Sequence, residues 1–253
     1  MDTDAQTVTG HVRAWAPTDT DTHTRSVVHP ASNEGIRRTF TQLASLYRHE
    51  GWIPSTYLDT MYMNTDQSDW QMFTATKRVE CPPEVCRDFL MDIDRVQEYE
   101  GMIKQAQCID SFSHDNLPVE LRRFVYSRVW PTTARELLVL SSATSAQDMI
   151  DRGWIPTDHP LTRGEDASRT LVIASTSATS RSAPDSDGGG QIRAHLYLSG
   201  YVMQPRDDGG TELSVFLHVD PRGDFTPVVC NHLIGMSVSA LLANVASALH
   251  QRQ

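Results

Sequence analysis

The sequence predicts an α+β domain in which a curved antiparallel sheet is closed by a long C-terminal helix. Three observations support this fold class. Apolar residues recur at helical spacing near the start of the chain, and many segments of alternating apolar and polar residues follow. Residues 228–250 then form one long segment without Asp, Glu, Lys or Arg. The order helix, strands, helix, strands and long helix is typical of a sheet covered by helices.

The elements can be placed in order along the chain. A first helix begins near Asn33 and ends before Gly51, and Pro82 with Pro83 opens a second helix, because proline is tolerated in the first turn. Residues 144–168 are expected to form a loop or a distorted region, and residues 180–190 a flexible connection. The apolar positions of the two helices are Ile36, Phe40, Leu43 and Tyr47 in the first, and Val85, Phe89, Ile93 and Val96 in the second. The expected strands are residues 57–63, 70–79, 107–113, 119–129, 135–143, 169–179, 191–204 and 211–219.

Composition limits the classes of partner. The chain has 253 residues, of which residues 1–32 are rich in Asp and Thr and are predicted to be a disordered N-terminal tail, with a single domain over residues 33–253. The net charge of −10 argues against nucleic-acid binding and against permanent docking on an anionic membrane, so we expect only transient membrane contact.

The cysteines and the N-terminus indicate the compartment. Cys81, Cys86, Cys108 and Cys230 show no Cys-x-x-Cys spacing, and the first residues carry neither a basic nor an apolar signal region. These features predict reduced thiols in a cytoplasmic protein that contacts membranes peripherally.

Residues 199–233 contain the most informative pattern. A turn at Asp207-Asp208-Gly209-Gly210 joins two strands, and the second strand alternates regularly. Its apolar face consists of Leu213, Val215, Leu217 and Val219. After it, Asp220-Pro221-Arg222-Gly223 and Pro227 lead into the uncharged helix, and this segment resembles the end of the START (steroidogenic acute regulatory protein-related lipid transfer) domain.

Two further segments carry the same resemblance, which covers roughly residues 34–251. Residues 129–140 are similar to the family's Trp-Pro…Arg-Asp-Phe signature, with Trp130, Arg135 and Glu136 at the matching places. In residues 85–100, Tyr99 lies where the family usually has Trp. The resemblance implies the helix-grip fold, with a hydrophobic tunnel between the sheet and the C-terminal helix.

The C-terminal segment has two interpretations. A helix over residues 228–250 would be about 35 Å long, enough to cross a bilayer or to cover a small domain. Its polar residues are scattered around the helix and would be costly in lipid: Asn231, His232, Ser237, Ser239, Asn244 and Ser247. We therefore favour a lid packed on protein over a membrane span.

Two strands predict residues that line the tunnel. In one strand the alternate apolar residues Ile192, Ala194, Leu196 and Leu198 share a face, and Val215 and Leu217 join them from the next. The same pattern would also suit an ordinary packed core, and only the resemblance favours a hollow.

The polar part of the site is predicted on the strand over residues 119–130. Sterol-binding members of the family bury an acid–Arg pair, but the matching places here hold Arg122 and Ser141, so the pair is not carried over. Either face of the strand could be the inner one. If the inner face is Arg122, Phe124, Tyr126, Arg128 and Trp130, its cations would suit an anionic head group.

We find no catalytic motif, no paired metal-ligand spacing and no cofactor signature. The sequence therefore predicts a non-enzymatic protein that binds one hydrophobic lipid, a sterol, a phospholipid or another, for transfer or sensing. A module whose protein interactions depend on the ligand is the main alternative, and cyclase-type chemistry on the same fold comes third.

Overall fold

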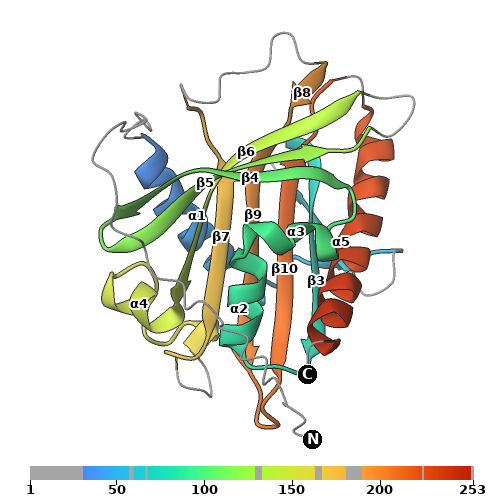
Figure 1. Cartoon of the computed structure of the whole chain (residues 1–253). Helices are drawn as coiled ribbons and strands as arrows, with labels where there is room; N and C mark the ends of the chain where they lie inside the picture. Colours follow the sequence, from blue (N-terminus) through green and yellow to red (C-terminus); the bar gives the residue numbers. More distant parts are fainter. Residues whose placement is uncertain are drawn as a thin grey trace, which may run out of the picture.

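The computed structural model describes residues 31–56, 60–65, 68–128, 133–162, 167–180, 190–223 and 225–251 (Figure 1). The predicted tail lies outside these ranges except for its last two residues, which begin helix α1. Ten strands form a single sheet in the order β1-β2-β3-β10-β9-β7-β6-β5-β4, with β8 paired to β6. The strands are β1 (Ile53–Pro54), β2 (Thr60–Thr65), β3 (Ser68–Val79), β4 (Ile103–His114), β5 (Leu117–Tyr126), β6 (Ala134–Ser145), β7 (Leu171–Ser177), β8 (Gln191–Arg193), β9 (His195–Pro205) and β10 (Thr211–Asp220).

All strand pairs except β6–β8 are antiparallel, as the alternating segments predict. The predicted hairpin joins β9 to β10, and Gly209 takes a φ of +81° in its turn, a conformation that is accessible to glycine. The curved antiparallel sheet with a long C-terminal helix confirms the predicted fold class (Figure 1).

The helices cover both faces of the sheet (Figure 1). Helix α1 lies on the outer face against β6, β7 and β9, whereas α2, α3 and α5 lie on the inner face. The helices are α1 (Ala31–Leu46), α2 (Pro83–Met91), α3 (Val96–Tyr99), α4 (Ala146–Asp151) and α5 (Pro227–His250), with 3-10 turns at Ile93–Arg95 and Pro160–Thr162.

Alternation along each strand divides the core into two layers. On β6, Leu138 and Leu140 pack toward α1 with Phe40, in the outer layer. On β10, Leu213 and Val215 pack in the inner layer with α5. Because both faces are covered, both carry buried apolar side chains.

The predicted second helix is shorter than expected. It ends at Met91, because the Asp92 backbone is extended (φ −77°, ψ 106°) and its side chain accepts a hydrogen bond from the Asp94 backbone N–H, which starts a 3-10 turn. The predicted apolar face is wrong at Val85, which is 47% exposed. The buried side of α2 consists of Pro83, Cys86, Phe89 and Leu90.

Helix α5 packs mainly across β3, with further contacts to β2, β10 and α3. Asn231 Oδ1 accepts a hydrogen bond from the Gln71 backbone N–H at 3.0 Å, and Asn244 Nδ2 donates to the Tyr99 carbonyl at 3.1 Å. The buried side of α5 consists of Cys230, Ile234, Gly235, Val238, Leu242, Val245 and Leu249. By length and composition α5 could also span a bilayer, but this packing and the paired asparagines agree with the lid interpretation.

Gly200 on β9 allows α1 to approach the outer face. A Cβ atom at this position would meet the Leu43 side chain and lie 2.5 Å from the Ile173 carbonyl oxygen. We expect Gly200→Ala to lower the free energy of unfolding by about 1–3 kcal/mol, because the helix or the strand must shift. Urea unfolding of both proteins measures this difference.

Gly101→Ala is the matched control, since a Cβ atom there would meet nothing within 4 Å. If the two variants unfold at the same urea concentration, the close approach of α1 to β9 does not limit stability.

Candidate ligand-binding site

The inner face of the sheet carries most of the predicted tunnel residues. Ala194 and Leu196 are buried in one cluster with Leu137 and Val139 of β6. Val215 is 1% exposed in the layer beneath α5. Leu217 is half-buried and contacts both clusters, so the predicted register of β10 is confirmed.

Leu198 is the exception among the predicted tunnel residues. It packs in the outer layer with Phe40 and Leu43 of α1, on the opposite face from Leu196. The pairing of β9 with β10 explains the difference, because His218 faces Leu198 while the next residue, Val219, faces Leu196. One extra residue on β9 forms a β-bulge, and such a bulge reverses the face on which later side chains lie.

On β5 the inner face is the one that carries Arg122, Phe124 and Tyr126. Phe124 and Tyr126 pack with the inner clusters, whereas Leu121 packs in the outer layer. The rest of the predicted cationic face is not confirmed. Arg128 lies beyond the end of β5 and is exposed, and Trp130 lies outside the described residues.

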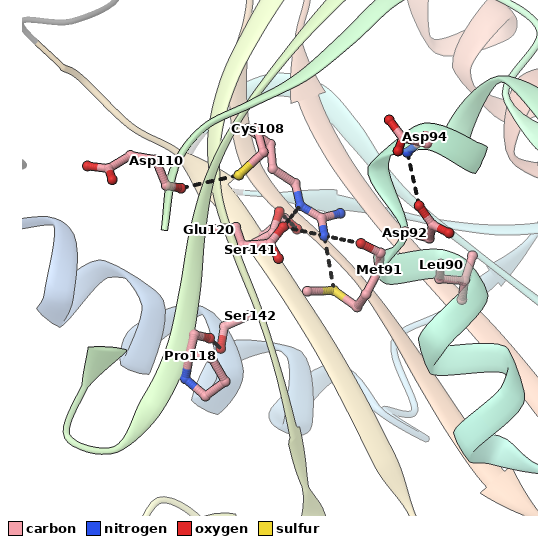
Figure 2. Close-up of polar contacts among 12 residues, drawn as sticks. Leu90, Met91, Asp92, Asp94, Cys108, Asp110, Pro118, Glu120, Ser141 and Ser142 are labelled. Atoms are coloured by element: carbon pink, nitrogen blue, oxygen red, sulfur yellow. Dashed lines mark hydrogen bonds and ion pairs between the residues drawn. The ribbon is translucent and has the colours of Figure 1, made fainter. Parts of the chain in front are cut away.

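Arg122 is buried in an ion pair that the sequence reasoning did not predict. Its Nη2 lies 2.6 Å from Glu120 Oε2, and its Nε donates to the same oxygen at 2.7 Å (dashed lines at Glu120 in Figure 2). Nη2 also donates to the Met91 carbonyl at the end of α2, at 2.5 Å. Glu120 and Arg122 have the same parity on β5, so both lie on the inner face.

Hydroxyl groups lie beside this pair. Ser141 faces Glu120 in the β5–β6 register, and its Oγ is 2.7 Å from Ser175 Oγ on β7. Ser199 of β9 faces Ser175 in turn. The three serines therefore form a row across the inner face, which we call the serine row.

Three tyrosines, Tyr99, Tyr126 and Tyr201, lie near one another on the inner side of the sheet, and Tyr99 belongs to α3. Burial raises the pKa of all three phenols, so they stay protonated at neutral pH. Tyr126 and Tyr201 nevertheless keep part of their surface accessible. They are therefore half-buried side chains that a ligand on the inner face could contact. Burial also raises the pKa of the neighbouring Glu100 carboxyl.

Two surface hollows lie elsewhere. One, of about 340 Å³, adjoins α1 and the β4–β5 turn at His114, Asp115 and Trp154. The other, of about 420 Å³, adjoins Glu98 and the C-terminal end of α5. Neither is lined by a residue of β6, β7, β9 or β10.

Arg135 connects β6 to the loop that precedes α5. Its Nε donates to the Pro221 carbonyl at 2.8 Å, its Nη2 donates to the Arg222 carbonyl at 3.0 Å, and its guanidinium lies 4.6 Å from the ring centre of Phe225. Ile192 packs close to the same loop: a Cβ atom added at Gly223 would lie 2.9 Å from Ile192 Cδ1. We call these contacts of Arg135 the loop latch.

Glu136, the next residue of the signature, points to the outer face. Its carboxylate is 1% exposed and pairs with Arg123 and with Arg193, whose Nη2 lies 2.5 Å from Oε1. This buried cluster joins β5, β6 and β8, so Glu136 is a structural residue here and does not reach the inner space.

Sequence reasoning missed Glu120, Ser175, Ser199 and the role of Arg135. Opposite charges two residues apart on a strand share a face, which could have indicated the Glu120–Arg122 pair. Ser175 and Ser199 come together only through the pairing of β7 with β9, which no local pattern reveals.

Comparison with known proteins agrees with this geometry. The START domain family model matches residues 41–252, and no curated protein sequence matches. The human StAR-related lipid transfer protein 5 structure has a TM-score of 0.66 at 16% identity, covering 86% of this chain and 98% of that one. Human STARD10 has a TM-score of 0.66 at 14% identity, covering 96% and 83%. A STAR-related lipid transfer protein fragment from Xanthomonas axonopodis has a TM-score of 0.58 at 14% identity, covering 81% and 100%. Because the family model spans most of the sequence, the chain belongs to the START domain family.

Proposed function

We propose that this protein binds one lipid molecule between the inner face of the sheet and helix α5, and carries it between membranes in the cytoplasm without acting as an enzyme. The observation that carries the proposal is the group of half-buried side chains on the inner face, Tyr126, Tyr201 and Leu217, which pack against the same cluster as the covering helix. Membership of the START family and the lipid-transfer proteins of the same fold support it.

Apolar burial supplies the driving force for uptake. Phe124, Leu196, Leu217 and Val219 offer hydrocarbon surface on the inner face. Each Å² of acyl chain removed from water contributes about 25 cal/mol, so a lipid tail gains several kcal/mol without any specific contact.

The exit route in this proposal runs past the start of α5. The loop latch holds Pro221, Arg222 and Phe225, and the first turns of α5 expose apolar side chains that follow them in the chain. Such a surface suits transient contact with a membrane, where the latch could open and the lipid could leave. The exposed residues are Val228 (81%), Val229 (52%), Leu233 (41%) and Met236 (52%).

Leu217→Asp tests the inner face. A carboxylate at this half-buried position faces apolar neighbours, so we expect lipid uptake to be lost and the free energy of unfolding to fall by about 3 kcal/mol or more. Uptake of fluorescent lipids from vesicles and urea unfolding measure the two effects.

The control is Val85→Asp, the same kind of change at an apolar residue that is 47% exposed. Full lipid uptake by Leu217→Asp would place the ligand elsewhere.

Arg135→Ala tests the loop latch. The variant loses the two hydrogen bonds to the loop carbonyls and the cation–π contact with Phe225, besides two hydrogen bonds to Thr133. We therefore expect lipid transfer between vesicles to accelerate about tenfold, the factor that ~1.4 kcal/mol produces. A stopped-flow assay with a self-quenched lipid measures the rate.

Arg152→Ala is the matched control, since Arg152 also lies over a ring, that of Trp154, and donates to a carbonyl, that of Asp115, away from α5. Equal transfer rates for Arg135→Ala and the wild type would show that the latch does not control exchange. If the protein binds lipid but transfers none and binds a partner only when loaded, the interaction-module alternative holds.

A further inference from the structure

The serine row gives the inner face a polar band at one level. The strand registers pair Ser141 with Ser175, Ser175 with Ser199, and Ser199 with Leu217. Neighbouring strands lie about 4.8 Å apart, so the backbone positions of the three serines repeat at roughly that spacing. At the β5 end, Glu120 pairs with Ser141 and continues the band.

Two of these serines hydrogen-bond each other, and the third has no partner in the part of the chain that the structure describes. A hydroxyl has one proton to donate and two lone pairs. The Ser141–Ser175 bond uses one proton, so the pair keeps a second proton and several lone pairs. Among the described residues, the Ser199 hydroxyl forms no hydrogen bond, although it lies on the inner face. The band therefore has hydrogen-bonding capacity that the protein does not use.

The ion pair beside the band is already neutral. Glu120 compensates the charge of Arg122, and the Met91 carbonyl accepts a further hydrogen bond from the guanidinium. An anionic head group placed here would leave a net negative charge in a buried site, which is costly. The pair therefore excludes anions instead of attracting them.

The other polar groups on this side of the sheet include two phenols, the Arg135 guanidinium and the Glu100 carboxyl, whose pKa is raised by burial. The Tyr126 and Tyr201 phenols have no hydrogen-bond partner among the described residues, and burial keeps them protonated. The Arg135 guanidinium is held by the loop carbonyls of Pro221 and Arg222.

We propose that the ligand is an uncharged lipid bearing hydroxyl or carbonyl oxygens, and that the serine row, next to the self-neutralised Glu120–Arg122 pair, binds those oxygens. This proposal rests on the proposed function and names its ligand class. It replaces the anionic head group that the sequence suggested, because Arg122 is neutralised by Glu120 and Arg128 is exposed.

The first experiment compares two lipids with the same acyl chains and glycerol backbone, one with an uncharged hydroxyl at the head and the other with an anionic phosphate. The full-length protein is incubated with phosphatidylcholine vesicles that contain equal amounts of dioleoylglycerol and dioleoylphosphatidic acid. Native mass spectrometry then identifies the lipid in the protein. We expect dioleoylglycerol to exceed dioleoylphosphatidic acid by about tenfold or more, the ratio that one charge-dependent contact can produce.

Ser175→Ala/Ser199→Ala tests the serine row directly. Loss of these hydroxyls should lower the uptake of dioleoylglycerol about tenfold and leave the uptake of dioleoylphosphatidic acid unchanged. Ser45→Ala is the control, because Ser45 is exposed on α1 at the outer face. Urea unfolding checks that each variant is folded.

Glu120→Gln gives a readout that a purely structural role would not produce. Glutamine keeps an oxygen that can accept from Arg122 but removes the compensating charge. The variant should therefore take up dioleoylphosphatidic acid in preference to dioleoylglycerol, the reverse of the wild type.

Each outcome decides between the two proposals. A wild-type preference for dioleoylglycerol together with reversal in Glu120→Gln supports the ligand class. Lipid uptake that favours dioleoylphosphatidic acid or phosphatidylcholine, or that shows no preference, overturns the ligand class and leaves the proposed function intact. If no lipid enters the protein at all, the proposed function itself fails, and the ligand class with it.

Discussion

Along one side of α5, Ile234, Val238, Leu242 and Leu249 pack onto the inner face of the sheet, mainly across β3. Because the helix contains no Asp, Glu, Lys or Arg, this contact is mainly apolar burial, with a few hydrogen bonds such as the one from Asn244. Such burial is strong in total but not directional. A covering element held in this way can move at the cost of the exposed contact between His250 and Glu80 (3.6 Å), but without separating a Lys or Arg of its own from a carboxylate.

Charge is distributed differently on the two faces of the sheet. Adjacent residues Arg122 and Arg123 point to opposite sides of β5, and each finds its own carboxylate, Glu120 on the inner face and Glu136 on the outer. The outer cluster, which includes Arg193, ties three strands together. The inner pair lies next to the serine row, where a ligand would meet it. One cluster therefore joins three strands, while the other forms a neutral ion pair on the inner face at the end of α2.

Arg135 and Glu136, the two charged residues of the segment that resembles the START signature, lie on opposite faces of the sheet. Arg135 lies on the inner face and holds the loop before α5, whereas Glu136 is buried on the outer face with its two arginines. Their opposite orientation follows from the two-residue period of a strand. Two adjacent residues of one sequence motif thus have different roles. Glu136 joins strands of the sheet, and Arg135 holds the loop before α5.

The sequence by itself determined the fold class, the order of most elements, and the inner face of β10, because these depend on local periodicity and turn chemistry. It also determined that α5 would contain no Asp, Glu, Lys or Arg, and its scattered polar residues favoured packing on protein over a membrane span. Only the tertiary structure decided that Leu198 faces outward, since that depends on a bulge formed against β10. The serine row was likewise decided by strand register, which joins Ser175 and Ser199 across a long connection. Pairing between distant strands is set by the packing of the whole sheet, and so local pattern could not reveal the polar part of the site.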